Sequence, residues 1–267
     1  MQTKGNPWGF PQAERLAWAD GLDVPLASDN PGFEVLWWVG CAGSFDRRAQ
    51  MVTRAIAKLL IKAGVNFAVL GPNECCTGDS ARRLGDEFLF QELAETNHAT
   101  LKQHGARKIL TQCPHCLNSL THDYPQFGDS FEVTHHTEFL QQLIDEGKLT
   151  APAENGSVTY HDPCYLARVN GVHQAPRDLL GKGVSEMENR REKTFCCGAG
   201  GGRMWMEEEA DQRVSVLRAK EAVATGAETV AVGCPFCLTM MTDGVKSCGS
   251  GADVEDVAEN LAKRLGL

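Results

Sequence analysis

Short apolar runs alternate along this chain with longer segments in which apolar residues recur every three or four positions. Runs such as EVLWWV (34–39) and NFAVL (66–70) have the length and composition of buried strands. The pattern predicts strands over residues 34–39, 66–70, 108–111, 158–161 and 228–232, and helices over residues 47–63, 88–104, 209–225 and 253–265. Strands that alternate with helices of this length are typical of α/β layers with parallel sheets.

The cysteines repeat at one spacing in the two halves of the chain. The first half contains Cys41, then Cys75-Cys76, then Cys113-Pro114-His115-Cys116, and the second contains Cys164, then Cys196-Cys197, then Cys234-Pro235-Phe236-Cys237. Each second-half cysteine follows its counterpart by 121 residues, except that Cys164 follows Cys41 by 123. Such a repeat indicates a tandem duplication. We therefore predict an N-terminal arm (1–32) and two duplicated cysteine-rich α/β domains (33–150 and 151–267), related by a pseudo-two-fold axis.

Composition and charge narrow the class of protein. The chain is 42% hydrophobic and 23% charged, as expected for an ordinary folded protein. Its 26 basic and 35 acidic side chains give a net charge of −9, which argues against a nucleic-acid partner. No apolar signal-peptide core opens the chain, and no apolar run approaches the roughly 20 residues of a transmembrane helix. We expect a cytoplasmic protein that reaches a membrane only through a partner, with cysteines used for metal or redox chemistry.

Five thiols in each half exceed the needs of a simple metal site. The motifs at Cys41, Cys113, Cys164 and Cys234 each follow a predicted strand, so we expect their thiols to meet at one sheet edge per half. Structural zinc takes four ligands, and an ordinary cubane cluster takes four thiolates. A zinc-stabilised binding module remains an alternative on these residues alone. Cys248 lies outside both sets, and we interpret it as a bystander.

The cysteine pattern resembles the cysteine-rich (CCG) domain pair found in the B and D subunits of heterodisulfide reductase. It stands here as ECCTGD (74–79) and FCCGAGGGRMW (195–205), with CPHC and CPFC closing the two halves. The resemblance spans about residues 34–243. Further runs are most similar to the iron–sulfur oxidoreductases linked to electron-transferring flavoprotein: GNPWG (5–9), WVGCAGSFD (38–46), CTGDSARRLG (76–85), HHTEFL (135–140) and YHDPCYLARVNGV (160–172).

The resemblance implies two [4Fe-4S] clusters of the noncubane type, one in each domain. The implied ligands of the first cluster are Cys41, Cys75, Cys76, Cys113 and Cys116, and those of the second are Cys164, Cys196, Cys197, Cys234 and Cys237. One departure concerns the first site, where Thr77 and then Gly78 follow the vicinal cysteines, whereas Gly198 follows them directly at the second. Both sites keep all five cysteines, but the match to the noncubane motif is weaker at the first site than at the second because of Thr77.

Two functions follow from this resemblance. The first is an iron–sulfur oxidoreductase subunit of heterodisulfide-reductase type, which reduces or forms a disulfide by one-electron steps on a disulfide/thiol substrate. The alternative is an electron-transfer module between electron-transferring flavoprotein and a quinone pool, without disulfide chemistry. Because the chain has no ferredoxin-type C-x2-C-x2-C run, we expect a ferredoxin-like iron–sulfur subunit or domain as partner. Electron-transferring flavoprotein or a membrane quinone-linked subunit is a further expected partner.

Several other residues are candidates for roles around the clusters, although no catalytic residue is assigned. We interpret Gly198 and Gly200 as cofactor-binding, because backbone amides of a glycine-rich loop can donate hydrogen bonds to sulfur. Acid–base candidates are His135, His136, Glu138, His161 and Asp162. Arg82, Arg83 and Arg168 could offset thiolate charge, but surface salt bridges are the more common role for such arginines.

Overall fold

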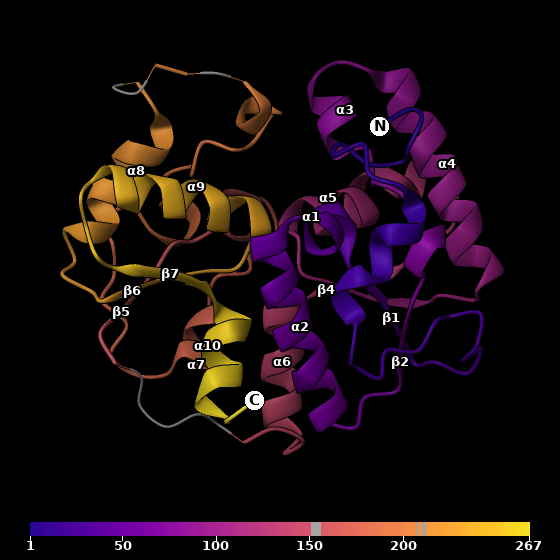
Figure 1. Cartoon of the computed structure of the whole chain (residues 1–267), viewed down its shortest axis with the longest axis horizontal. Helices are drawn as coiled ribbons and strands as arrows, with labels where there is room; N and C mark the ends of the chain where they lie inside the picture. Colours follow the sequence, from indigo (N-terminus) through magenta and orange to yellow (C-terminus); the bar gives the residue numbers. More distant parts are fainter. Residues whose placement is uncertain (151–155, 207, 210–211) are drawn as a thin grey trace. The chain divides into compact units, whose positions relative to one another are not determined.

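Each half of the chain builds its own parallel sheet (Figure 1). The computed structural model describes residues 1–150, 156–206, 208–209 and 212–267. The chain divides into two compact units, Met1–Phe139 (unit 1) and Leu140–Leu267 (unit 2). The domain boundary predicted at residue 151 falls on residues 151–155, outside the described residues, and stays a prediction. The α/β class with parallel sheets is confirmed in both units.

Unit 1 carries a four-stranded sheet in the order β2-β1-β3-β4, with every pair parallel. Its strands are β1 (Val35–Trp38), β2 (Phe67–Val69), β3 (Lys108–Thr111) and β4 (Glu132–His135). Trp37 of the central strand pairs with Val69 on one side and Leu110 on the other. Side chains of β1 are buried on both faces, which explains the continuous apolar run in the sequence.

Helices connect these strands, as parallel pairing requires. The helices of unit 1 are α1 (Gly40–Phe45), α2 (Arg47–Lys62), α3 (Asp79–Arg83), α4 (Glu87–Gln103) and α5 (Pro114–Asn118), with short turns η1 (Gln12–Ala19), η2 (Gly71–Asn73), η3 (Ser119–Asp123) and η4 (Tyr124–Phe127). Helix α6 (His136–Asp145) begins in unit 1 and ends in unit 2. Helix α2 shows why they form: the Asp46 carboxylate caps it by accepting from the Ala49 amide at 2.8 Å, and Ile56, Leu59 and Leu60 bury one face.

The N-terminal segment, residues 1–32, packs as part of unit 1 rather than standing off as an arm. Trp18 is buried, and its ring lies 5.3 Å from the ring of Trp37, centroid to centroid. Leu26 forms a parallel bridge with Val69, so the segment extends the sheet edge next to β2. Burial of an aromatic ring and backbone pairing together hold this segment in place.

Unit 2 carries a three-stranded parallel sheet in the order β5-β6-β7. Its elements are β5 (Val158–Tyr160), η5 (Tyr165–Val169), α7 (Ala175–Leu180), η6 (Arg191–Lys193), η7 (Arg203–Trp205), α8 (Val214–Val223), β6 (Thr229–Val232), α9 (Pro235–Ser247), β7 (Asp253–Asp256) and α10 (Val257–Arg264). In place of a counterpart to β2, the edge beside β5 has an isolated bridge between Thr159 and Ser185.

Two helices of unit 2 begin later in the chain than the sequence pattern predicted. The helix predicted over residues 253–265 begins only at Val257, because residues Asp253–Asp256 pair in parallel with β6 as strand β7. The helix predicted over residues 209–225 begins at Val214, since Arg213 before it has an extended backbone; residues 210–211 lie outside the described residues. Strand β4 in unit 1 was not predicted.

Candidate functional site

Each Cys-Pro-x-Cys motif forms the start of a helix directly after a strand. Cys113 occupies the N-cap position of α5, and Cys234 that of α9. In both helices proline takes the first position, where its fixed φ suits the helix and its missing N–H costs nothing. The second cysteine of each motif, Cys116 or Cys237, then lies on the first helical turn. Residues at these two positions turn to the same side, so the motif presents two thiols together.

The five cysteines of the first set converge in unit 1. The Cys76 thiol hydrogen-bonds to the Cys41 sulfur, and Cys116 hydrogen-bonds to Cys113. Cys41 also interacts electrostatically with Cys75 and Cys116. The prediction that the strand-end cysteines meet is confirmed in unit 1, where the vicinal pair joins them, while the role of these cysteines as ligands stays a prediction.

A buried ion pair closes one side of the first set. Arg15 donates from Nη2 to the Cys41 sulfur at 3.0 Å and from Nη1 to Glu74 Oε1 at 2.5 Å. The Glu74 carboxylate also accepts from the amides of Val39 and Gly40, at 3.0 and 2.9 Å. Arg15 is 1% exposed and Glu74 is 2% exposed. Burial raises the pKa of Glu74, against the opposing effects of Arg15 and the two amides.

The N-terminal segment also covers the vicinal pair of the first set. Gln12 Nε2 lies 3.4 Å from the Cys75 sulfur, and the Cys76 amide donates to the carbonyl of Gly5 at 2.7 Å. A Cβ at Gly5, where φ is +62°, would come within 2.9 Å of the Cys75 sulfur. Glycine is therefore required there by both backbone conformation and close approach. On the opposite side, the Asn97 side chain donates to the Cys76 carbonyl at 2.8 Å.

The five cysteines of the second set converge in unit 2. The sulfurs of Cys164 and Cys196 lie 4.0 Å apart, and those of Cys237 and Cys197 lie 3.3 Å apart. Cys234 hydrogen-bonds to Cys237, and Cys196 to Cys197, so all five thiols form one connected group. All eleven cysteines lie among the described residues and none is in a disulfide. Cys248 belongs to neither set; its sulfur lies 3.9 Å from the carbonyl of Val216.

The glycine-rich loop points its amides at the second set. The Gly198 amide donates to the Cys196 sulfur at 3.3 Å, and the Gly200 amide also donates to Cys196. Gly198 has a φ of +93°, and a Cβ there would lie 3.2 Å from Cβ of Val214 on α8. In unit 1 the corresponding donor is Gly78, which contacts Cys76 at 3.5 Å. Because Thr77 precedes Gly78, the amide reaches the second cysteine of the vicinal pair in unit 1 and the first in unit 2.

In each set, one cysteine has a lowered pKa because it accepts hydrogen bonds from neighbouring groups. A hydrogen bond to a neighbouring cysteine sulfur, together with burial, raises the pKa of five thiols: Cys76, Cys116, Cys164, Cys197 and Cys237. Burial opposes ionisation of Cys41, but the hydrogen bond from Cys76 and the charge of Arg15 lower its pKa. Hydrogen bonds from Cys164 and Cys197 and the two glycine amides lower the pKa of Cys196. Because several thiols in each set have a raised pKa, a set with all five cysteines as thiolates would need a cationic centre such as a metal cluster beside it.

The arginines and the histidine pair that the sequence analysis named lie in different environments. Arg82 pairs with Asp123 at 2.7 Å and Arg83 with Asp79 at 3.2 Å, which are structural ion pairs. Arg168 is exposed. The rings of His135 and His136 lie 4.3 Å apart at the end of β4, with His135 Nδ1 at 2.8 Å from the Thr137 hydroxyl. Their acid–base role stays a prediction.

His161 and Asp162 are buried in unit 2 directly before Cys164. Arg218 Nε donates to His161 Nδ1 at 2.9 Å. Burial, with Arg218 adding to it, holds the pKa of His161 well below its usual range. Arg177 donates to both Asp162 oxygens at 2.8 Å, and the Arg191 amide donates to the same carboxylate. Asp162 therefore anchors the segment that leads to Cys196.

Sequence reasoning missed the polar groups that contact the cysteines or the residues beside them: Gln12, Arg15, Glu74, Asn97, Arg177 and Arg218. Asn97 and Arg218 occupy equivalent positions of the repeat, 121 residues apart, but their residue types differ, so the repeat does not single them out. No pattern in the sequence identifies Arg15 and Glu74 either, because these two residues come together only when the N-terminal segment folds within unit 1.

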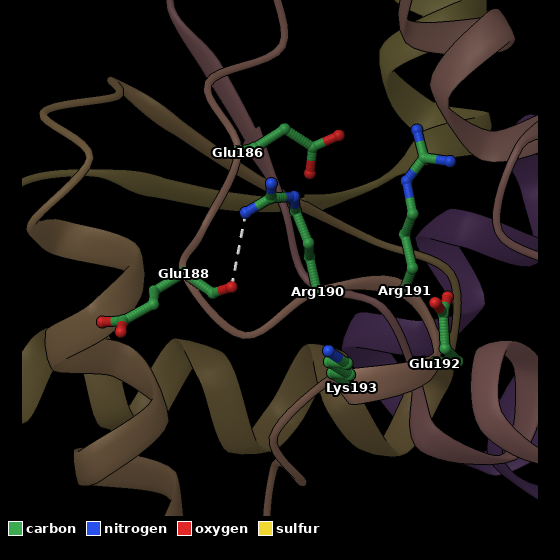
Figure 2. Close-up of a pocket in the computed structure, with 6 residues that line it drawn as sticks. All are labelled: Glu186, Glu188, Arg190, Arg191, Glu192 and Lys193. Atoms are coloured by element: carbon green, nitrogen blue, oxygen red, sulfur yellow. Dashed lines mark hydrogen bonds between the residues drawn. The ribbon is translucent and has the colours of Figure 1, made fainter.

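A surface recess of about 510 Å³ lies on the same segment before Cys196. Figure 2 shows its lining, with Arg190 donating to the Glu188 carbonyl at 3.3 Å. The side chains around it are Glu186, Glu188, Arg190, Arg191, Glu192 and Lys193. Three carboxylates and three cations cancel in formal charge, so the recess favours neither an anion nor a cation.

Comparison with known proteins agrees with this architecture. Residues 35–121 and 158–242 match the CCG family, described as "Cysteine-rich domain". The "Probable iron-sulfur-binding oxidoreductase FadF" of Bacillus subtilis is 44% identical over 98% of this chain and 39% of its own length. The "EtfAB:quinone oxidoreductase" of Syntrophomonas wolfei is also 44% identical, over 99% of this chain and 40% of its own. This chain thus spans about two fifths of the length of these two relatives.

More distant matches extend the comparison. The D subunit of the dihydromethanophenazine:CoB--CoM heterodisulfide reductase of Methanosarcina mazei is 38% identical over 98% of this chain and 65% of its own length. A crystal structure of a hypothetical protein from Helicobacter pylori aligns with a TM-score of 0.56 at 10% identity, covering 87% of this chain and 49% of that one, and shows the fold alone. Among the described residues, no helix combines the length and apolar composition needed to span a bilayer. The relatives are named as iron–sulfur oxidoreductases and as a heterodisulfide reductase subunit. With two matched copies of its domain, this chain belongs to the cysteine-rich (CCG) domain family.

Proposed function

We propose that this chain binds one [4Fe-4S] cluster in each unit and acts as the redox subunit of a heterodisulfide-reductase-type enzyme. The observation that carries the proposal is the gathering of ten cysteines into two connected sets of five. Five thiols exceed the four of a tetrahedral zinc site or an ordinary cubane, which favours a noncubane arrangement. The glycine amides that already contact sulfur at the second site support the same assignment there.

Positively charged or hydrogen-bond-donating groups lie next to the cysteines of each set and would stabilise negative charge on their sulfurs. When bound, an iron–sulfur cluster would supply one-electron redox chemistry. Arg15 places a permanent positive charge against Cys41, and the amides of Gly198 and Gly200 point at Cys196. Such hydrogen bonds stabilise electron density on sulfur. Reduction of a disulfide consumes two electrons and two protons and yields two thiols, with the electrons supplied by a ferredoxin-like partner subunit or domain.

Metal analysis of matched cysteine variants tests the cluster assignment. Anaerobically reconstituted protein should contain iron and acid-labile sulfide, and Cys197→Ala should lose them from one site. Cys248→Ala is the matched control, because Cys248 lies outside both sets, and it should keep the wild-type content. Zinc without sulfide in the wild-type protein would refute the proposal and favour the zinc-stabilised binding module. Unchanged disulfide turnover by Cys197→Ala in the full complex would refute the catalytic part.

A second function is favoured by one comparison. The relative named EtfAB:quinone oxidoreductase is 44% identical over nearly the whole of this chain. By analogy, the chain would carry electrons from electron-transferring flavoprotein toward a membrane quinone pool without disulfide chemistry, and would meet the membrane through a partner. Cluster reduction by reduced flavoprotein, monitored by visible absorbance, would support this function. Reduction by small thiol/disulfide couples alone would contradict it.

A further inference from the structure

In unit 2, one ring nitrogen of a buried histidine accepts a hydrogen bond, while the other has no hydrogen-bond partner within the part of the chain that the structure describes. His161 is fully buried directly after β5, and its amide donates to the carbonyl of Ala231 at 2.9 Å. A ring nitrogen of His161 and the sulfurs of Cys197 and Cys237 all lie within 4.8 Å of one another. Among the residues that the structure describes, none hydrogen-bonds to Nε2 of His161.

The contact with Arg218 fixes which nitrogen carries the proton. Arg218 Nε lies 2.9 Å from His161 Nδ1, and a guanidinium has donors but no acceptor. Nδ1 must therefore accept with its lone pair, so the ring proton of His161 is on Nε2. Nε2 is then a buried N–H donor that has no acceptor among the described residues, and such a group is costly to leave unsatisfied.

Arg218 is itself held firmly enough to impose this tautomer. It is fully buried on α8, and its Nη1 donates to the Asn189 carbonyl at 2.8 Å and to Glu221 Oε2 at 2.6 Å. Its Nη2 lies 3.5 Å from the Thr194 hydroxyl, two residues before Cys196. The guanidinium therefore cannot turn away from His161 without giving up several hydrogen bonds at once.

This arrangement is the reverse of that around a metal-ligating histidine. A ligating imidazole normally donates its second N–H to a carboxylate or carbonyl, leaving the other nitrogen free to bind the metal. Here the second nitrogen faces a donor. We infer that His161 is not a ligand but donates a hydrogen bond from Nε2–H to a sulfur of the second cluster, at Cys197 or Cys237. This inference rests on the proposed cluster at that site. The bond would stabilise added electron density and raise the reduction potential of the second cluster.

The pair of His161 and Arg218 is not repeated in unit 1. At the repeat offsets of 123 and 121 residues, the corresponding positions are Trp38 and Asn97. Asn97 donates to the Cys76 carbonyl and to the Tyr124 hydroxyl rather than to an imidazole. The histidine–arginine pair is therefore specific to the second site, whereas the equivalent residue of the first, Trp38, carries an indole N–H that has no hydrogen-bond partner among the described residues.

Redox titrations monitored by electron paramagnetic resonance test the inference on anaerobic, cluster-loaded full-length chain. In His161→Phe, one midpoint potential should fall while the other stays, with about a tenfold weaker equilibrium constant for reduction, equal to about 59 mV for one electron. His161→Gln keeps an N–H at a similar reach and should restore most of the shift. His104→Phe, a half-buried histidine at the end of α4, is the control and should change neither potential.

Both midpoints unchanged in His161→Phe would overturn the inference while leaving the proposed function intact. Wild-type protein without iron and sulfide would instead overturn the proposed function. If His161→Phe does not assemble, electron–nuclear double resonance on wild-type protein with ¹⁵N-histidine decides. A weak ¹⁵N coupling with an exchangeable proton supports the hydrogen bond. A strong coupling typical of direct iron–nitrogen coordination, or no coupling at all, overturns it.

Discussion

Replacing Arg15 with methionine should destabilise unit 1 by about 3–5 kcal/mol, the usual cost of removing one partner from a buried ion pair. The substitution leaves the Glu74 carboxylate buried, with only the amides of Val39 and Gly40 as partners. With Arg15 in place, the cavity beside the ion pair is too small to hold a water molecule. The loss of the Arg15 stacking on Phe45, whose ring centre lies 5.3 Å away, adds to the cost.

A second substitution separates charge from packing. In Arg15→Met/Glu74→Gln no buried charge remains, and the amide oxygen of glutamine can still accept from a backbone N–H. We therefore expect the double variant to recover about 2–3 kcal/mol, within the range of coupling energies for residues in contact. Lys58→Met is the control, because Lys58 is exposed on α2, and it should change stability by less than about 0.5 kcal/mol.

Urea unfolding of reduced, metal-free protein provides the measurement. Trp18, Trp37 and Trp38 are buried in unit 1, so tryptophan fluorescence reports on that unit. With m-values of about 1–3 kcal/mol per molar urea, the loss should lower the midpoint by roughly 2 M. A loss below about 1 kcal/mol for Arg15→Met, or no recovery in the double variant, would show that the buried pair does not act as described.

The pH dependence gives an independent check of the same pair. Burial raises the pKa of Glu74 above its ordinary value of 4.5 even with Arg15 present, and removing Arg15 should raise the pKa further. A carboxyl whose folded pKa is raised favours the folded state when protonated. The stability of Arg15→Met should therefore be highest below about pH 4.5 and should fall as the pH rises through the folded pKa of Glu74. In the double variant this dependence should disappear.

Two further predictions concern unit 2. Gly244→Ala should destabilise it by about 1–3 kcal/mol in thermal or urea unfolding, because a Cβ on α9 would lie 2.5 Å from the Ser215 carbonyl oxygen on α8; Gly251→Ala, with nothing within 4 Å, should be nearly neutral. The Arg177 hydrogen bond holds the pKa of Glu186 below its ordinary 4.5, so its contribution is complete above that pH and is lost as the pH falls through the folded pKa. Melting temperatures from pH 6 to pH 3 should fall less for Glu186→Gln than for wild type, and parallel curves would contradict this assignment.

Much of the fold could be predicted from the sequence because buried elements appear in it as local patterns of apolar residues. Strand β1 is buried on both faces and therefore appears as an unbroken apolar run, and the Pro of each Cys-Pro-x-Cys motif marks a helix start. Strand β7 shows no such pattern. Its sequence, DVED, is mostly acidic, and only pairing with β6 and the contacts of Glu255 with Asn260 and Lys263 make it a strand.

The cysteines of the candidate site were predictable, whereas their polar neighbours were not. Spacing alone identifies ten thiols, since the repeat preserves their offsets. Arg15 meets Cys41 across 26 residues, and Arg218 meets His161 across 57. Nothing in the local sequence distinguishes these arginines from salt-bridged surface residues, because their burial depends on tertiary packing.

The N-terminal segment shows that a homology boundary and a site boundary can differ. The family match begins at residue 35, yet Gly5, Gln12 and Arg15 contact the first cysteine set from outside it. A fragment trimmed to the matched region would keep all five cysteines of that set and still lose the charge beside Cys41 and the cover over Cys75. Gene duplication supplied two sets of five cysteines, and a segment from outside the repeat surrounds the first set with residues of its own. Duplicated sites can diverge in this way while their cysteines stay the same.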